Sequence, residues 1–342
     1  METRDIILFV MIFALGAVSI SLIYEVSKIT SEEPLAVISN PVRFNRRYEL
    51  YRKFEKHMKD SGVNLITVET QQGDRPFQVT SETEKNHIQL RTFDELWIKE
   101  NMINIGVSRL PSDWEYMAWI DADIMFMRDD WAAETVHQLQ HYMFVQLWES
   151  CVDLGPVGEP LQIQKSFCSE YIKNGCRPPV GPGYYGYYSP KKNFWHPGYA
   201  WACRREAFDF VGGLIDFCIL GSGDHSMAMG LIGEIKRSVP SDIGSKFMDE
   251  LLIWQQRAEK EIKRDIGYVP GTISHYWHGK KKDRKYVERW DIIRDNDYDP
   301  DDDLKRDWQG LLQLEAMTDR QRRFRDQIRA YFRQRNEDSI DL

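Results

Sequence analysis

The sequence predicts an α/β fold in which a mostly parallel sheet is flanked by helices, with an N-terminal transmembrane helix and a charged C-terminal helical tail. Apolar runs of strand length alternate with helical stripes over residues 34–120, residues 6–24 carry no charge, and residues 291–342 are rich in charged side chains. At 342 residues, 42% of them apolar and 29% charged, the chain is long enough for one large α/β domain with a sizeable core.

The first elements follow a short polar linker. Residues 34–40 (PLAVISN) form a continuous apolar run, which is the pattern of a buried parallel strand. Residues 46–62 predict a helix whose apolar stripe consists of Tyr48, Tyr51, Phe54 and Met58. Residues 63–70 (VNLITVET) predict a second strand.

A second helix and a third strand are expected next. Residues 92–110 open with Thr92 and Glu95 at the spacing of a capping box and place apolar side chains on one face. Residues 116–120 (YMAWI) predict a strand that ends at Asp121. Strand, helix, strand, helix and strand within about 90 residues is typical of a parallel sheet with right-handed connections.

The apolar residues 6–24 are long enough to cross a membrane. As a helix they would span roughly 28 Å at about 1.5 Å per residue, so a single-pass anchor is expected, and a cleaved signal peptide is the alternative. The expected boundaries are 1–26 for the anchor, 34–290 for the main domain and 291–342 for the tail. A secretory or Golgi-type lumen and a viral-host membrane both fit, and the side of the membrane stays open.

The remaining regions carry weaker signals. Residues 151–199 are rich in Gly, Pro and Tyr, which predicts loops and short strands that bind substrate. The tail predicts a capped, mostly exposed helix or helix pair without chemistry. The net charge of −8 disfavours nucleic-acid binding, and five cysteines without CxxC spacing indicate neither a zinc ribbon nor a disulfide framework.

Two carboxylates follow the third strand directly. Asp121 and Asp123 form one of five D-x-D patterns in the chain, but the other four lie in the acidic stretch 295–303, where a solvated loop and a helix N-cap explain them. Ligands of open α/β sheets bind at the carboxyl ends of strands, and paired carboxylates favour a hard divalent cation. A metal site is therefore expected, and a turn in which the aspartates cap backbone amides is the alternative.

Two further clusters fit such a site. Residues 274–286 (SHYWHGKKKDRKY) contain His275 and His278, which can complete a site for a cation such as Mn²⁺, and a run of lysines that can contact phosphate as point charges. Gly221–Ser222–Gly223 delivers Asp224 to the start of a predicted helix, where it could take a proton from an acceptor hydroxyl. The alternatives are a solvated basic face, structural histidines, and Asp224 as a helix N-cap.

These motifs resemble those of the GT-A-fold glycosyltransferases. "WIDADIMF" is similar to the D-x-D strand end of that family, "HYWHGKKKDRKYVERW" to its C-terminal His–Gly–Lys segment, and "GGLIDF…GSGDH" to its acceptor segment. The order matches from about Pro34 to Trp290, and the whole also resembles glycosyltransferase-like proteins of phages and large viruses. Two departures are Gly-Asp-His in place of Glu-Asp at Asp224, and the lack of Pro-Trp after "HGKKK".

The resemblance implies a Rossmann-like GT-A domain and a role for each matching residue. Asp123 and His278 would bind Mn²⁺ or Mg²⁺, and Asp121 would contact the metal or the donor ribose. Asp224 would be the catalytic base. Three further residues would contact the donor, with Lys282 near the diphosphate and Asn40 and Arg43 near the nucleotide.

The predicted function is transfer of a sugar from a nucleotide-sugar donor to a hydroxyl acceptor, most simply a glycan. The resemblance implies hexosyl or N-acetylhexosaminyl transfer and favours a UDP-sugar. The alternatives are a metal-dependent nucleotidyltransferase or phosphohydrolase, and a non-catalytic carbohydrate-binding protein of the same fold.

Overall fold

The computed structural model describes residues 34–179 and 195–341. The predicted anchor at residues 1–26 lies outside this part of the chain. Within the described residues, no helix is both long and apolar enough to cross a membrane.

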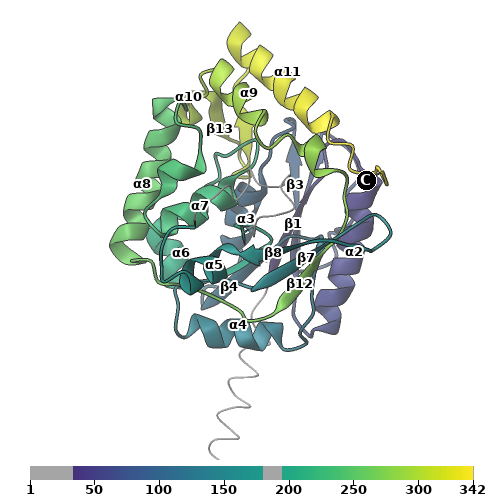
Figure 1. Cartoon of the computed structure of the whole chain (residues 1–342). Coiled ribbons are helices and arrows are strands. Elements are labelled where there is room, and N and C mark those ends of the chain that lie inside the picture. The colour runs from purple at the N-terminus through teal and green to yellow at the C-terminus, as the bar shows by residue number, and fades with distance from the viewer. Residues whose placement is uncertain (1–33, 180–194, 342) are drawn as a thin grey trace, which may run out of the picture.

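A seven-stranded sheet forms the centre of the molecule (Figure 1). Its strand order is β11-β6-β10-β4-β1-β2-β3, and only β10 pairs antiparallel with its neighbours. The strands are β1 (Leu35–Ser39), β2 (Ile66–Gln72), β3 (His87–Thr92), β4 (Tyr116–Ile120), β6 (Phe144–Gln146), β10 (Ala200–Arg204) and β11 (Ile266–Tyr268). The prediction of an α/β fold with a mostly parallel sheet is therefore confirmed.

Helices cover both faces of this sheet because successive residues of its strands point to opposite sides. Leu35 belongs to a core cluster shared with α3 and α6–α8, whereas Ala36 belongs to a cluster shared with α2 and α4. The helices are α2 (Asn45–Asp60), α3 (Lys99–Val107), α4 (Trp131–Leu139), α5 (Phe167–Lys173), α6 (Arg205–Val211), α7 (Gly223–Leu231), α8 (Ser245–Glu261), α9 (Arg289–Asp295), α10 (Pro300–Asp303) and α11 (Asp319–Arg333). The predicted stripe of α2 is confirmed, since all four of its residues are buried.

A second sheet lies beside the first and carries part of the site. Its order is β5-β12-β7-β8-β9, from β5 (Ile124–Phe126), β7 (Ser150–Leu154), β8 (Pro160–Ser166), β9 (Trp195–His196) and β12 (Thr272–His275). The prediction of only loops and short strands for residues 151–199 missed helix α5, which begins at the capping side chain of Ser166.

The predicted capping box at Thr92 and Glu95 is wrong. Thr92 is the last residue of β3, a strand that the sequence reading missed, and its hydroxyl bonds to the side chain of Gln313 at 3.1 Å. Helix α3 starts only at Lys99. Tertiary pairing of β3 with β2 thus overrides the local helix signal.

The tail contains more than helices. β13 (Leu304–Arg306) and β14 (Leu312–Leu314) form a hairpin before α11. Helix α11 has the expected cap, a capping box between Thr318 and Gln321, and its buried face, which includes Phe324 and Tyr331, joins the core of the main sheet. In the acidic stretch, Asp299 is the N-cap of α10, as the turn-and-cap interpretation expects.

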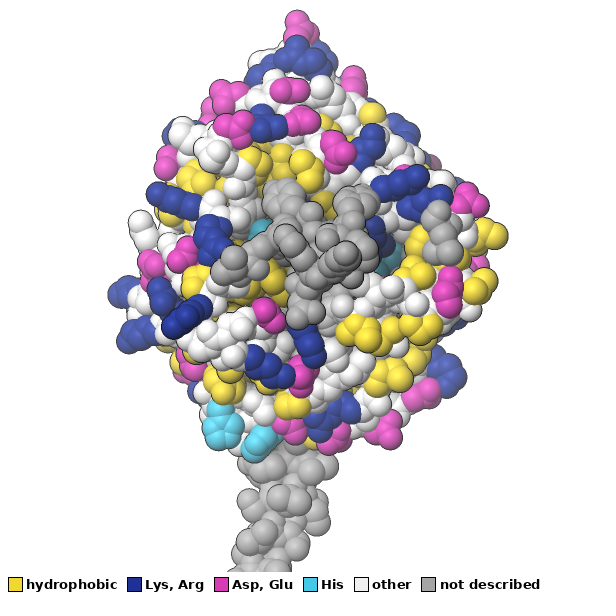
Figure 2. All heavy atoms as spheres, viewed as in Figure 1, with side chains coloured by type: hydrophobic (Ala, Val, Ile, Leu, Met, Phe, Trp, Pro, Cys, Tyr) yellow, Lys and Arg dark blue, Asp and Glu magenta, His cyan; other side chains and the backbone are white. Residues whose placement is uncertain are grey.

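Charged side chains are spread over the surface. Figure 2 shows Lys and Arg side chains interspersed with Asp and Glu over the face in view. The acidic side chains visible on this face are therefore not gathered at one place.

Candidate active site

The turn between β4 and β5 carries the two predicted carboxylates. Strand β4 ends at Ile120, and Asp121 and Asp123 lie in the turn that leads into β5. β5 pairs antiparallel with β12, so that Ile124 lies opposite His275, and the backbone N–H of Tyr276 donates to the carbonyl oxygen of Asp123 at 2.8 Å. Strand pairing thus brings residues 275–278 against the turn.

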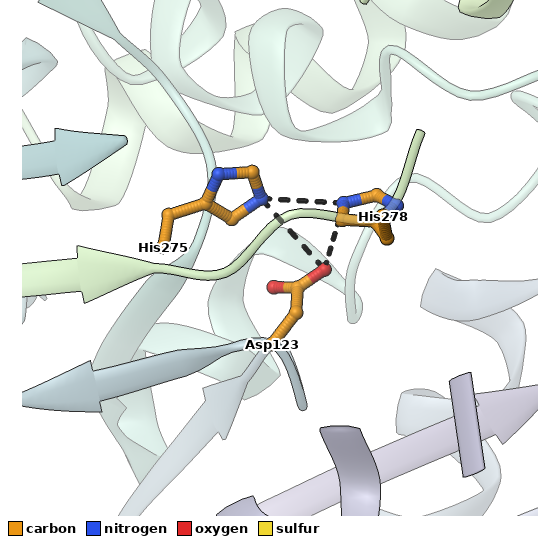
Figure 3. Close-up of side chains that lie close together, drawn as sticks. All are labelled: Asp123, His275 and His278. Atoms are coloured by element: carbon orange, nitrogen blue, oxygen red, sulfur yellow. Dashed lines mark hydrogen bonds and ion pairs between the residues drawn. The ribbon is translucent and has the colours of Figure 1, made fainter. Parts of the chain in front are cut away.

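Asp123, His275 and His278 converge on one point (Figure 3). The Oδ2 atom of Asp123 lies 3.1 Å from Nε2 of His278 and 3.8 Å from Nε2 of His275, and the two Nε2 atoms are 3.3 Å apart. Ligands about 2.1 Å from one metal ion lie about 3.0–3.4 Å from each other, which is close to these separations. Among the described side chains, Oδ1 of Asp123 is buried without a hydrogen-bond partner. One carboxylate and two imidazoles therefore fit a divalent cation such as Mn²⁺.

Electrostatics keep Asp123 and His278 in the forms that bind metal. Burial raises the pKa of Asp123, but His275, His278 and Arg284 together bring it well below its usual range. Burial, followed by the neighbouring Arg284, lowers the pKa of His278 to about 4. A carboxylate must be ionised and an imidazole neutral to bind a metal ion, so Asp123 and His278 are in their binding forms at neutral pH.

A buried carboxylate orients His275. Asp153 lies on β7, where the parallel register with β12 places it beside His275, and its Oδ1 is 2.9 Å from Nδ1 of that ring. Lys281 and Gln164 hold the other oxygen of Asp153. A proton held on Nδ1 leaves Nε2 of His275 free to face Asp123, the arrangement common at metal-binding histidines.

Asp121 has a different partner. Its Oδ1 lies 3.1 Å from Nζ of Lys99, at the start of α3. Burial raises the pKa of Asp121, and Lys99 opposes that shift. Glu100, which follows Lys99 in the sequence, is also buried. Burial raises its pKa to about 7, although the charge of Lys99 opposes this shift. Asp121 is thus held in an ion pair with Lys99. It is not one of the three side chains that converge, which are Asp123, His275 and His278.

A cavity of about 130 Å³ lies at the carboxyl ends of β1 and β4. Its polar lining includes Asp121, Asp123, His278 and Lys99, together with Arg47 of α2. Its apolar lining includes Val37, Ile38, Leu50, Leu96, Ile98 and Met102, with Phe332 from α11. A charged end beside the metal group and an apolar end suit a ligand that is itself part charged and part apolar.

Two predicted donor contacts have other surroundings. The amide of Asn40 is buried and bonds twice to the backbone of Phe44, donating at 2.7 Å and accepting at 2.9 Å. Asn40 therefore shapes the turn after β1. Arg43 is exposed in that turn and has a positive φ of 67°. Arg47, one helical turn further along, is the arginine that lines the cavity.

Lys282 and Asp224 are not among the residues that line the cavity beside Asp123. Lys282 is exposed and lines a second cavity of about 310 Å³, together with Lys280, Lys281, Arg284 and His275. Asp224 is the second residue of α7, so the N-cap position belongs to Ser222. Its Oδ1 accepts from the N–H of His225 at 2.8 Å, and it lies against Gly198, where an added Cβ would be 2.3 Å from Oδ2.

Several residues lie at the site that the sequence did not predict there. Lys99, Arg47 and Asp153 were not singled out, and His275 was noted without being assigned as a ligand. The acidic Asp153 alternates with apolar residues in "SCVDL", which is a weak signal, because a polar residue in a strand most often faces solvent.

The comparisons with known proteins give distant similarities. No protein-family model matches the chain, and no curated protein sequence matches it. Two structures of Drosophila β1,4-galactosyltransferase 7 are 12% and 13% identical, cover 83% of this chain and 94% of theirs, and have TM-scores of 0.38 and 0.37. The first contains manganese, UDP-Gal and xylobiose, and the second contains xylobiose.

A third structure comes from Desulfovibrio desulfuricans and is assigned as a nucleotide-diphospho-sugar transferase. It is 11% identical, covers 78% of this chain and 96% of its own, and has a TM-score of 0.31. At these identities and TM-scores the similarities carry no functional argument, which has to come from the site itself.

Proposed function

We propose that this chain is a metal-dependent glycosyltransferase of the GT-A type, which moves a sugar from a nucleotide-sugar donor to a hydroxyl acceptor. The observation that carries the proposal is the convergence of Asp123, His275 and His278 beside a cavity at the strand ends. A Mn²⁺ or Mg²⁺ ion held by these side chains would neutralise the diphosphate leaving group.

Different residues of the chain would bind the nucleotide, contact the phosphates and accept the proton of the acceptor hydroxyl. The apolar end of the cavity suits a nucleotide base, and Asp121, held by Lys99, lies where it could accept a hydrogen bond from a ribose hydroxyl. Lys282 and its neighbours in the second cavity supply positive charge for phosphate oxygens. Asp224 is the candidate base, since its carboxylate is partly exposed at the start of α7.

The first test is binding. Isothermal titration should show UDP binding in the presence of Mn²⁺ and much weaker binding when EDTA removes the metal. Asp123→Ala, checked for folding by circular dichroism, should abolish the metal-dependent part. Equal UDP binding with and without metal, in both proteins, would contradict the proposal.

The second test is product analysis. UDP-galactose and UDP-N-acetylhexosamines are suitable first donors, with glycan acceptors, because hexosyl or N-acetylhexosaminyl transfer is the proposed chemistry. Release of UDP means sugar transfer, whereas release of sugar 1-phosphate would indicate attack at the nucleotide phosphate, as in a nucleotidyltransferase or phosphohydrolase. Binding without any turnover would favour the non-catalytic carbohydrate-binding alternative.

Attachment to a membrane through residues 1–26 is a separate part of the proposal. It rests on the uncharged run from Ile6 to Tyr24. Full-length protein should sediment with membranes and resist carbonate extraction, whereas a chain starting at Pro34 should not.

A further inference from the structure

Residues 335–339, near the C-terminus, lie against the segment that carries His275 and His278. Asn336 and Glu337 pack on the turn that follows His278, where a Cβ on Gly279 would lie 2.8 Å from the carbonyl oxygen of Asn336. The indole N–H of Trp277 donates to the carbonyl oxygen of Ser339 at 2.7 Å. Residues 335–339, which we call the C-terminal strap, are therefore fixed to the segment that carries the two histidines.

Glu337 is the centre of this strap. Its side chain is 0% exposed, and it accepts two hydrogen bonds from the guanidinium of Arg47, at 2.5 and 2.6 Å. Arg335 lies 2.8 Å from the same carboxylate. Burial raises the pKa of Glu337, but Arg47 and Arg335 bring it well below its usual range, so the group is charged. Both arginines also line the cavity beside Asp123.

The carboxylate of Glu337 lies on the Nδ1 side of the His278 ring. Oε2 of Glu337 is 3.9 Å from Nδ1 of His278, while Nε2 of that ring points to Asp123. Nε2 of His278 lies 2.9 Å from Arg284, which has only donors, and 3.1 Å from Oδ2 of Asp123. The neutral ring accepts from Arg284 when its proton is on Nδ1, which is also the tautomer that leaves Nε2 open to a metal ion. That proton therefore faces the negative charge of Glu337.

The two histidines have related surroundings, with Asp153 hydrogen-bonded to the ring of His275 at 2.9 Å and Glu337 at 3.9 Å from the ring of His278. Each presents Nε2 to Asp123 and has a buried carboxylate on its Nδ1 side, Asp153 for His275 and Glu337 for His278. Such carboxylates fix the tautomer of a metal-binding histidine and raise its basicity, and losing one typically costs about 10–100-fold in metal affinity.

We infer that Glu337 is a positioning residue of the metal site, so that the C-terminal strap completes the site which the turn after β4 begins. It acts through His278 and through Arg47, without touching the metal. This inference rests on the proposed metal-dependent function. It assigns a role to the C-terminal tail, for which the sequence predicts no chemistry.

Mn²⁺ affinity tests it, measured by titration calorimetry and by the loss of the free-ion EPR signal. Glu337→Gln keeps the shape and removes the charge, and we expect a 10–100-fold weaker affinity. Asp338→Asn is the matched control in the same strap. Asp338 accepts from the N–H groups of Asn45 and Arg46 at the start of α2, and its substitution should change Mn²⁺ affinity by less than about twofold.

The outcomes separate the two proposals. If the wild type binds no Mn²⁺, both fail. If the wild type binds Mn²⁺ and Glu337→Gln binds it equally well, or if both variants weaken it equally, only the role of Glu337 fails. Should Glu337→Gln not fold, NMR of the metal-free wild type decides, because a His278 ring protonated on Nε2 instead of Nδ1 would overturn the inference.

Discussion

The two aspartates of the turn after β4 are separated only by Ala122, yet they have different charged neighbours. Asp123 faces two histidines and Arg284, which bring its pKa below the usual range, and it is one of the three side chains that converge at the candidate metal site. Asp121 faces Lys99, and burial raises its pKa. A D-x-D pattern therefore does not make two equivalent ligands, because the side chains that other segments bring to the turn decide what each carboxylate can do.

The segments that surround Asp123 also differ from those that surround Asp121. The Asp123 side is assembled from β12, β7 and the C-terminal strap, and its acidic groups are backed by cations or imidazoles. The Asp121 side is assembled from the starts of α3 and α7, where Glu100 and Asp224 add negative charge around one lysine. The first side is suited to hold a cation, and the second to hold or move protons.

The largest expected effect separates the two aspartates directly. Asp123→Asn should abolish measurable Mn²⁺ binding and lower sugar transfer by at least about 1,000-fold, because a metal ion supplies several kcal/mol of charge stabilisation. Asp121→Asn should leave Mn²⁺ affinity within about tenfold of the wild type while lowering transfer. Calorimetry and initial-rate assays measure both, and equal loss of Mn²⁺ binding in the two variants would make Asp121 a ligand as well.

The part of the fold that local pattern controls could be predicted. β1, α2 and β4 each carry a pattern that depends on their own residues, a buried apolar run or an amphipathic stripe, and each formed at the expected place. β3 was missed because "HIQLRT" is a short alternating run whose strand state depends on pairing with β2. Thr92 then gave a false helix start, since the same residue ends that strand.

The candidate site could be predicted only where its residues adjoin such elements. Asp123 follows a strand, so its position was evident, but the strand register that places Asp153 beside His275 joins residues 122 positions apart. Glu337 meets Arg47 across 290 positions, and nothing in the sequence of the tail marks that contact. The donor contact of Asn40 stays a prediction, and the structure shows its amide bonded to the backbone of a local turn, because Asn readily bonds to nearby backbone groups.

Gly198 offers a test of the Asp121 side of the turn, because it lies against Asp224. A Cβ at this position would lie 2.3 Å from Oδ2 of Asp224 and 3.0 Å from Cε1 of His196. Gly198→Ala should therefore displace Asp224, and we expect transfer to fall about 100-fold, the usual cost of a displacement of about 1 Å. Mn²⁺ affinity should stay within about twofold, since Asp224 is not among the three converging ligands.

Gly244→Ala is the control for this substitution. A Cβ there would meet nothing closer than 3.5 Å, and the backbone φ of −54° suits any residue. Its transfer rate should match that of the wild type. Normal activity of Gly198→Ala would exclude Asp224 from the reaction, whereas weakened Mn²⁺ binding would show that the two sides of the turn are coupled.

The smallest effect is a pH dependence of stability that originates at Glu100. Its folded pKa of about 7 lies above the value near 4.3 of an exposed Glu, through burial and the charges of Asp224 and Asp121, with Lys99 opposing. Between these two values the folded state binds more protons than the unfolded state. Glu100 therefore lowers the free energy of unfolding as pH rises from about 4.3 to about 7, and the loss is complete above that range.

Glu100→Gln keeps the neutral shape at every pH, so it should stabilise the protein at pH 8 and have little effect at pH 4.5. We expect a gain of the order of 2 kcal/mol at pH 8, measured by urea unfolding at both pH values. Glu82→Gln, at an exposed position, should show no such pH-dependent difference. A gain at pH 8 no larger than that at pH 4.5 would mean that Lys99 neutralises Glu100 as it does Asp121, and that the Asp121 side is as well compensated as the side that holds the metal.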